Sequence, residues 1–314
     1  MEITAGMVKE LRELSGAGMM DCKKALGECN GNIEEAMEYL RKNGQAKAEK
    51  KASRIAAEGL CRVAQVSDTV AAVVEVNSET DFVAKNEEFQ AFVMSVAEQA
   101  AETKAADVET FLAEAWKTDT AKTIKEVLVE KIAKIGENLN IRRFEKVVAD
   151  EGMVATYVHG GGKIGVIVEA KTDVVNEKVK EALTNLAMQI AAMSPLHVST
   201  DEISEEYKAK EKEILLSQAL LENSQLEAGK QKSQEIIEKM MIGRLAKQLK
   251  EICLLEQVYV KAEDGKQTVG QYVAAVAKEN NVAFSIKRFV RFETGEGLEK
   301  KEEDFAAEVA KQMA

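Results

Sequence analysis

The stretch of sequence that decides the fold is VAAVVEVNSETDFVAKN, residues 70–86. Residues 70–76 are almost all apolar and rich in valine, which predicts a buried strand. Residues 77–81 are polar and typical of a turn, in which Thr80 or Asp81 can cap the helix that follows. Phe82 is therefore expected at a strand-to-helix corner, and such corners normally lie at the surface.

A phenylalanine at this corner is compatible with two structures. Its ring can fold back onto the following helix as a hydrophobic staple. Alternatively, the ring can project into solvent and serve as an anchor for a partner protein. The chemistry of the residues alone favours the staple for Phe82.

Composition limits the classes of function. A length of 314 residues suggests about two domains, and the single proline and the charged fraction of 31% suit long helices with solvated faces. The net charge of −11 argues against nucleic acid as the main ligand, because phosphate binding needs a concentrated basic face. We therefore expect a protein partner and no direct contact with nucleic acid.

The sequence also indicates the compartment and the state of the thiols. No apolar stretch approaches the roughly 18 to 20 residues of a membrane span, and residues 1–4 lack the positive start of a signal peptide, so we expect a cytoplasmic protein without membrane contact. The cysteines have no CxxC spacing and only two histidines could join them, which argues against zinc. We expect reduced thiols at Cys22, Cys29, Cys61 and Cys253, and neither a cofactor nor a metal.

Residues 1–54 predict a small helical module. Apolar residues at helical spacing indicate helices at 7–14, 22–28 and 33–42, the last ending at Asn43-Gly44. Met19 and Met20 are adjacent and cannot share one helical face, so at least one is expected at the surface. A Gly-x-Gly loop followed by an exposed methionine resembles protein-binding modules of the ubiquitin-associated type. Residues 45–57 predict a helical, solvated connector.

The middle of the chain contains an internal repeat. Residues 60–97 match residues 154–191 at an offset of 94, which aligns Glu75 with Glu169 and Gln65 with His159. Each copy predicts strand, tight turn, strand and helix, an α+β unit rather than a βαβ unit. Residues 136–144 and 282–292 add a strand to each copy. We therefore expect two related α+β subdomains with antiparallel sheets.

The turn Gly160–Lys163 resembles a phosphate loop only superficially. A strand rather than a helix N-terminus follows it, so a hairpin tip is the better interpretation. His159 lies at the edge of this tip. No carboxylate or cysteine has a spacing that would orient it as a ligand or base, and a surface position is expected.

Two charged helical stretches, residues 203–226 and 233–252, are separated by a break at 227–229. This pattern predicts an antiparallel helical hairpin that projects from the second subdomain. The hairpin could pair with a second copy to form a homodimer, lie alone, or be a solvated insertion without function.

Together these patterns predict an α+β protein with five parts. They are a ubiquitin-associated-like module with its connector (1–54), an N-terminal core subdomain (55–151), a C-terminal core subdomain (152–198 and 253–292), a coiled-coil hairpin (199–252) and a C-terminal module with a helix (293–314).

Five motifs in order along the chain resemble the elongation factor Ts family, the guanine-nucleotide exchange factors of elongation factor Tu. They are Leu11-Arg12 with Gly16–Leu26, Glu75-Val76-Asn77 with Thr80–Ala84, Ile135-Gly136-Glu137-Asn138, His159-Gly160, and Arg291-Phe292-Glu293 with Gly295-Glu296-Gly297. The resemblance covers the whole chain and implies the same five-part organisation. It also implies a translation elongation factor that promotes release of GDP from elongation factor Tu so that GTP can bind.

The resemblance implies roles for eleven residues. Asp81 and Phe82, flanked by Thr80 and Val83, would reach the magnesium and phosphate site of the partner, which reverses the preference for a staple. Ile135 and Gly136 would form a second exchange contact. The remaining partner contacts would be Arg12, Met19 and Met20 in the N-terminal module, His159 at the hairpin tip and Phe305 in the terminal helix. The Ser78-Glu79 pair is interpreted as a freely variable part of the turn.

An exchange factor needs a wedge rather than a nucleophile, a base or a metal, so we do not expect an enzyme. The alternative is an adaptor of the ubiquitin-associated type that binds partners without exchange activity. Release of GDP from elongation factor Tu discriminates between the two.

Overall fold

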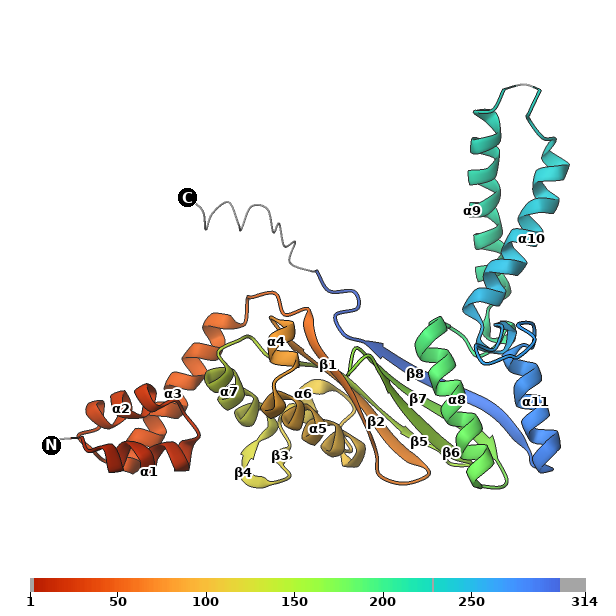
Figure 1. Cartoon of the computed structure of the whole chain (residues 1–314). Helices are drawn as coiled ribbons and strands as arrows, with labels where there is room; N and C mark the ends of the chain where they lie inside the picture. Colours follow the sequence, from red (N-terminus) through yellow and green to blue (C-terminus); the bar gives the residue numbers. More distant parts are fainter. Residues whose placement is uncertain (1–2, 228, 300–314) are drawn as a thin grey trace.

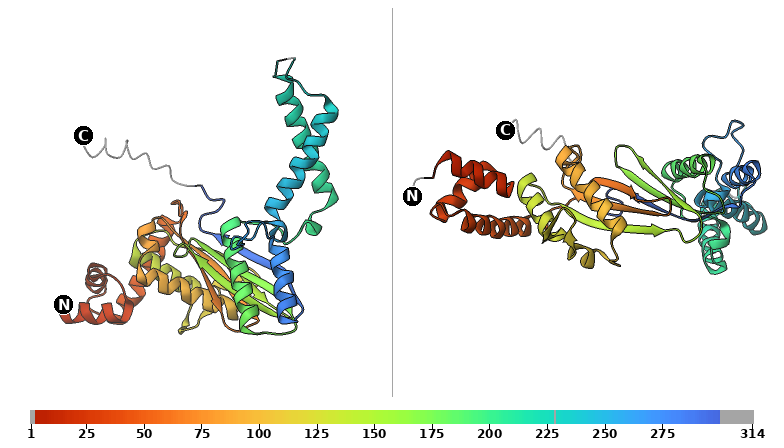
Figure 2. Two further views of the ribbon diagram at one scale, coloured as in Figure 1. Left: turned by 45° about the vertical axis from the view of Figure 1, so that its right-hand side comes forward. Right: turned by 90° about the horizontal axis from the view of Figure 1, so that it is seen from below.

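The computed structural model describes residues 3–227 and 229–299. It confirms the predicted fold class, α+β with antiparallel sheets. Three helices lie at one end of an elongated molecule, two three-stranded sheets and a small two-stranded sheet lie in the middle, and a helical hairpin projects near the other end (Figure 1). Two further views show the same separation between the N-terminal helices and the hairpin (Figure 2). The five-part division into domains stays a prediction.

The N-terminal module consists of α1 (Ala5–Ser15), α2 (Met19–Glu28) and the first half of α3 (Ile33–Lys51). Thr4 caps α1, since its hydroxyl accepts a hydrogen bond from the Met7 N–H at 3.3 Å. The three helices enclose a small apolar core made of Val8, Leu11, Cys22, Ala25, Leu26 and Ala36.

The prediction that the third helix ends at Asn43-Gly44 is wrong. Helix α3 continues to Lys51, and Gly44 lies against α7 (Ile124–Ile135), where an added Cβ would be only 3.6 Å from the Ala133 Cβ. Ala48, one turn further, is buried in the same contact. The predicted connector therefore begins as a docked helix, because glycine here permits close helix packing instead of ending the helix.

The first unit, as we call it, contains a three-stranded antiparallel sheet in the order β1-β2-β5, formed by β1 (Glu58–Gln65), β2 (Val70–Ser78) and β5 (Asn140–Val148). Helices α5 (Glu87–Glu102) and α7 share an apolar core with one face of this sheet. Several elements between α5 and β5 were not predicted. They are α6 (Val108–Leu112), β3 (Ala115–Trp116), β4 (Asp119–Thr123) and α7.

The second unit repeats this arrangement. Its sheet has the order β6-β7-β8, formed by β6 (Met153–His159), β7 (Ile164–Thr172) and β8 (Phe284–Glu293), and its core is completed by α8 (Glu177–Met193) and α11 (Val269–Asn280). The pairing is irregular after Glu75 in β2 and after Glu169 in β7, so the aligned glutamates occupy equivalent positions.

The alignment of the first strands needs a correction of one residue. Cys61 pairs with Glu75, and Val154 pairs with Glu169. Gln65 is therefore equivalent to Val158 rather than to His159. The difference matters because a shift of one residue moves a side chain to the opposite face of a sheet.

The two sheets pack against each other through the faces that their helices leave open. A third apolar core lies between them and contains Cys61, Ala71, Val73, Val147, Ala149, Val154, Ile167, Val290 and Phe292. An added Cβ on Gly165 would be 3.0 Å from Val73 Cγ2, so the sheets approach most closely where glycine allows it. Strand β2 is consequently buried on both faces, which explains its continuous apolar run.

The helical hairpin consists of α9 (Glu205–Ser224) and α10 (Gln234–Ile252). The short 3-10 helices η1 (Thr200–Glu202) and η2 (Leu254–Glu256) flank it. Leu215 and Ala219 of α9 pack on Ile237 and Met241 of α10. Among the described residues, no helix is both long enough and apolar enough to cross a membrane. The predicted terminal helix and Phe305 lie outside the described residues.

Candidate functional site

The corner between β2 and α5 presents Phe82 to solvent. Thr80 caps the one-turn helix α4 (Asp81–Ala84), and its hydroxyl accepts a hydrogen bond from the Val83 N–H at 3.4 Å. The Phe82 side chain is 80% exposed, whereas Val83 and Ala84 are buried in the core of the first unit. The staple favoured by residue chemistry is therefore wrong, and α4 is held by the face opposite to Phe82.

Asp81 and Lys85 surround the exposed ring with charge. Asp81 Oδ2 accepts a hydrogen bond from Lys85 Nζ at 2.6 Å, and this bond lowers the pKa of Asp81 below its usual value. The same Lys85 Nζ lies 5.8 Å from the centroid of the Phe82 ring, within the range of a cation–π contact. The corner thus offers a partner an apolar ring beside an ionised carboxylate.

The loop after α7 lies beside this corner. Gly136 ends α7 in the left-handed conformation, with φ of 89° and its N–H donated to Ile132 O at 3.0 Å. Ile135 is half-buried and Gly136 is exposed. The next residue, Glu137, accepts hydrogen bonds from the Glu79 and Thr80 N–H groups, both at 3.0 Å. The structure therefore brings the two predicted exchange segments, 80–83 and 135–136, together.

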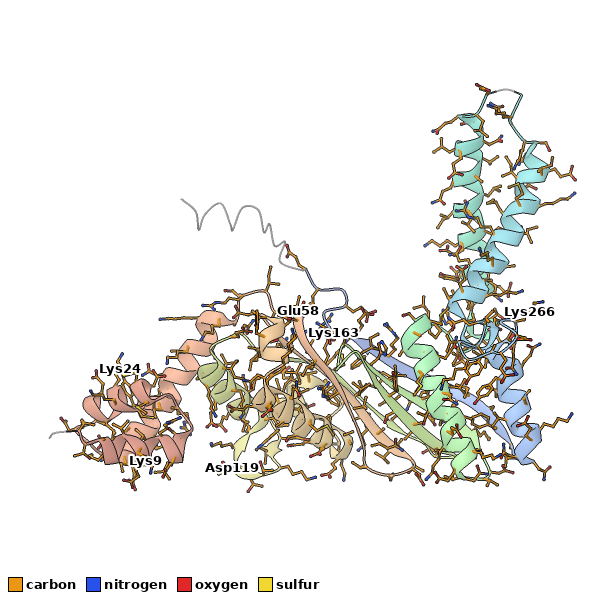
Figure 3. All side chains as sticks on the ribbon, viewed as in Figure 1. Lys9, Lys24, Glu58, Asp119, Lys163 and Lys266 are labelled. Atoms are coloured by element: carbon orange, nitrogen blue, oxygen red, sulfur yellow. The ribbon has the colours of Figure 1, made fainter. Side chains whose placement is uncertain are left out.

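The tip of the β6–β7 hairpin reaches the same end of the first unit. Gly162 O accepts a hydrogen bond from the Cys61 N–H at 2.7 Å, and Lys163 Nζ is 2.5 Å from Glu58 Oε2. Figure 3 shows the labelled Glu58 and Lys163 side chains next to each other. Lys163 also contributes to the low pKa of Asp81, after Lys85. The interpretation of Gly160–Lys163 as a hairpin tip is confirmed.

His159 is exposed at the end of β6. Its Nδ1 lies 3.1 Å from the hydroxyl of Tyr157, and the two rings are 5.9 Å apart. Its polar contact is thus with a neighbouring side chain of its own strand. The structure places His159 at the surface, as predicted.

The predicted contacts of the N-terminal module lie apart from the Phe82 corner (Figure 1). Met19 and Met20 open α2 with 58% and 75% of their surfaces exposed, and Arg12 is exposed on α1. Leu14, 59% exposed, adds apolar surface to the module and was not predicted. Lys47 Nζ bonds Asp21 Oδ1 at 2.8 Å and ties α2 to the docked half of α3.

Glu75 organises the buried side of the site, and sequence reasoning did not predict its role. Its carboxylate accepts hydrogen bonds from Arg142 Nη1 at 3.0 Å, Arg143 Nε at 2.6 Å and the Gly295 N–H at 2.8 Å. Burial raises the pKa of Glu75, but the hydrogen bonds from Gly295, Asn77 and the two arginines outweigh it and lower the pKa overall. This cluster anchors the segment that leads toward residue 299.

The contacts of Glu79 and Glu137 were also missed, and the interpretation of Glu79 as a freely variable turn residue stays a prediction. Glu79 Oε1 accepts a hydrogen bond from the Asn138 N–H at 2.6 Å and lies 3.4 Å from Arg54 Nη1. Ser78 is fully buried. The only sequence signal for these contacts is the Ile135-Gly136-Glu137-Asn138 motif itself.

Comparisons with known proteins agree with this architecture. Residues 79–296 match the family model described as Elongation factor TS. Over 99% of both chains, the sequence is 54% identical to elongation factor Ts of Clostridioides difficile, 50% to that of a Clostridium botulinum strain and 48% to that of Clostridium tetani. The resemblance predicted from the five motifs is confirmed. The chain belongs to the elongation factor Ts family of translation elongation factors.

Proposed function

We propose that this chain is a cytoplasmic guanine-nucleotide exchange factor that binds elongation factor Tu in its GDP form and promotes release of GDP. Family membership supports the partner and the reaction. The observation that carries the mechanism is the 80% exposure of Phe82 on a one-turn helix whose next two residues, Val83 and Ala84, are held in the core. Aromatic residues, phenylalanine among them, are enriched at the centres of protein–protein interfaces.

The proposed reaction makes and breaks no covalent bond. An exchange factor binds the nucleotide-free partner more tightly than the nucleotide-bound partner, and this difference weakens nucleotide binding by the same free energy. A difference of about 1.4 kcal/mol changes the nucleotide affinity tenfold. The protein therefore needs surface that fits only the open partner, not a catalytic group of its own.

Phe82 and Asp81 supply that surface in the proposal. The ring of Phe82 would enter the partner beside its magnesium and phosphate site and displace elements that hold the metal. The Asp81 carboxylate, kept ionised by Lys85, would raise the free energy of a state in which phosphate stays nearby, since like charges repel. Both effects favour the nucleotide-free partner.

The other predicted residues would position the partner. Ile135 and Gly136 lie next to the corner and would form the second exchange contact, with Thr80 and Val83 holding α4. Met19, Met20 and Arg12 would bind from the N-terminal module, His159 from the hairpin tip and Phe305 from the terminal segment. Contacts at several separated places would bind the partner while only one of them acts on the nucleotide.

A homodimer through α9 and α10 also stays a proposal. Leu221 is 63% exposed and Ile236 is 50% exposed, which supports a further apolar contact on the hairpin. A hairpin that lies alone is the alternative, and sedimentation of the purified chain distinguishes the two.

The test is stopped-flow release of fluorescent GDP from elongation factor Tu, combined with direct binding of the two proteins. We expect the full chain to accelerate release, and excess GDP to weaken binding by the factor by which the chain weakens GDP binding. Binding without accelerated release would overturn the proposal and support an adaptor of the ubiquitin-associated type.

A further inference from the structure

We propose that Glu137 is a positioning residue for nucleotide exchange, which holds the Phe82 corner in the conformation that presents the ring. This inference rests on the proposed exchange function. The Glu137 carboxylate makes three hydrogen bonds to the corner. Oε2 accepts from the Glu79 and Thr80 N–H groups at 3.0 Å each, and Oε1 accepts from the Thr80 hydroxyl at 2.6 Å.

The third bond determines how Thr80 caps α4. A hydroxyl has one proton to donate, and Thr80 donates it to Glu137. The lone pairs of the same oxygen then face the Val83 N–H, which lies 3.4 Å away. Glu137 thus orients the cap that starts the helical turn carrying Phe82.

A one-turn helix needs such external support. Forming a first helical turn is unfavourable by itself, because several dihedral angles are fixed for a single hydrogen bond. The apolar ring of Phe82, which is 80% exposed, would also gain by collapsing onto the surface. The buried residues Val83 and Ala84 hold one side of α4, and Glu137 fixes the chain where it enters the turn.

Comparison of the two units shows which contacts of the corner are common to both and which occur only in the first. The strand pairings align the units, because Glu75 pairs with Arg143 in the first and Glu169 pairs with Arg288 in the second. Counting from the glutamates makes Glu79 equivalent to Asp173. Counting from the arginines makes Asn138 equivalent to Ala283. The bond from the Asn138 N–H to Glu79 therefore recurs as the bond from the Ala283 N–H to Asp173, at 2.8 Å.

The Glu137 contact does not recur. The position equivalent to Glu137 holds Val282, a half-buried apolar residue that packs on the core of the second unit. In that unit Thr172 supports the corner from within, since its hydroxyl accepts from the Val174 N–H at 3.3 Å. Among the described residues, the hydrogen bonds of Glu137 to the corner thus occur only in the unit that also carries α4 and Phe82.

The experiment compares Glu137→Ala, Glu137→Gln and Phe82→Ala with the double variant of Glu137→Ala and Phe82→Ala. Each full-length protein is tested for release of fluorescent GDP from elongation factor Tu. In the free proteins, hydrogen exchange of the Glu79 and Thr80 amides is measured without the partner. Asp173→Ala is the matched control, because it removes a loop-to-corner hydrogen bond from the second unit and leaves the first unit unchanged.

We expect Glu137→Ala to reduce accelerated GDP release by at least about fivefold and to speed exchange of the two amides about tenfold. Glu137→Gln keeps the length and one acceptor oxygen for the two N–H groups, but its amide nitrogen cannot accept the Thr80 hydroxyl proton, so we expect a release rate between those of the wild type and Glu137→Ala. In the Phe82→Ala background, Glu137→Ala should have little further effect, because Glu137 acts through the ring. Asp173→Ala should leave release unchanged.

Several results would overturn the inference. Normal release by Glu137→Ala, unchanged protection of the two amides, or a full additional loss in the Phe82→Ala background would each do so. A Gln variant that releases GDP more slowly than the Ala variant would also overturn the inference, because Gln keeps an acceptor for the two N–H groups and Ala does not. A wild-type chain that fails to accelerate release would instead overturn the proposed function, and with it any exchange role for Glu137. Protection of the Glu79 and Thr80 amides would still show whether the hydrogen bonds to Glu137 form.

Discussion

The corner after β2 and the corner after β7 begin in the same way and end differently. Both follow a central strand with a buried glutamate, and both lead to a helix capped by asparagine, Asn86 for α5 and Asn176 for α8. The first corner contains the extra turn α4 and an aromatic ring that is 80% exposed. The second passes directly into its helix through Val174 and Val175, which are 41% and 43% exposed.

The difference shows how a duplicated unit can carry a function in only one copy. The buried glutamates are common to both copies and serve the fold, and so are the backbone hydrogen bonds that Glu79 and Asp173 accept. We call these two bonds the shared clasp. The extra turn and Glu137 are features of the first copy alone among the described residues. If this division is correct, substitutions of shared residues should change stability, and substitutions of unshared residues should change exchange.

The largest expected effect on stability comes from the buried glutamates. Glu75→Ala should lower the free energy of unfolding by about 3 kcal/mol, because it leaves arginines whose side chains are only 23% and 31% exposed without their partner. Glu169→Ala should cost about 2 kcal/mol, since its partners, Lys287 and Arg288, are 49% and 44% exposed. Urea unfolding measures both, and an equal or larger loss for Glu169→Ala would contradict this order.

Acid should reveal the same two groups with a smaller effect. Hydrogen bonds lower the pKa of Glu75 and of Glu169 below 4.5 despite burial. A lowered pKa in the folded state stabilises the protein above pH 4.5, and this contribution is lost as the pH falls through the folded-state pKa. Unfolding free energies at pH 7 and pH 3 should therefore differ less in Glu75→Gln than in the wild type. An identical difference in both would show that Glu75 contributes nothing to acid sensitivity.

The smallest expected effect on stability comes from the shared clasp. Glu79→Ala should cost about 1 kcal/mol, because its carboxylate is 21% exposed and bonds both the Asn138 N–H and Arg54. Asp173→Ala removes a single bond at an exposed position and should cost about 0.5 kcal/mol. Chemical denaturation of the two variants side by side checks the order. An unchanged unfolding free energy in either variant would show that the shared clasp stabilises only one unit.

Sequence reasoning predicted the features that leave a local pattern. The valine-rich run of β2 and its counterpart in β7 are visible because a strand buried on both faces must be continuously apolar. The repeat, the α+β class and the helical hairpin follow from such patterns. The position of Phe82 at a corner was also predictable. Local chemistry could not decide its exposure, because a staple and an anchor have the same sequence, and only the family resemblance favoured the exposed ring.

Features that depend on distant residues were not predictable. Gly44 has the sequence signature of a helix end, and only the approach of α7 shows why α3 continues. The bond between Thr80 and Glu137 joins residues 57 positions apart, and no periodicity relates them. The shift of one residue between the first strands is set by the pairing with β2 and β7 and cannot be derived from matching residue types.

The most direct test of the account is GDP release from elongation factor Tu by Phe82→Ala, with Val175→Ala from the second corner as the matched control. We predict that Phe82→Ala reduces accelerated release at least about tenfold, since an interface anchor commonly contributes 2 kcal/mol or more. The unfolding free energy should change by less than about 0.5 kcal/mol, because the ring is exposed. Asp81→Ala should act in the same direction but more weakly, and Val175→Ala should not act at all.

The contrary result is equally clear. A normally folded Phe82→Ala protein that releases GDP at the wild-type rate would show that the exposed ring is not the wedge. Slow release accompanied by a large loss of stability would show that Phe82 supports the fold, in contradiction to its exposure in the structure.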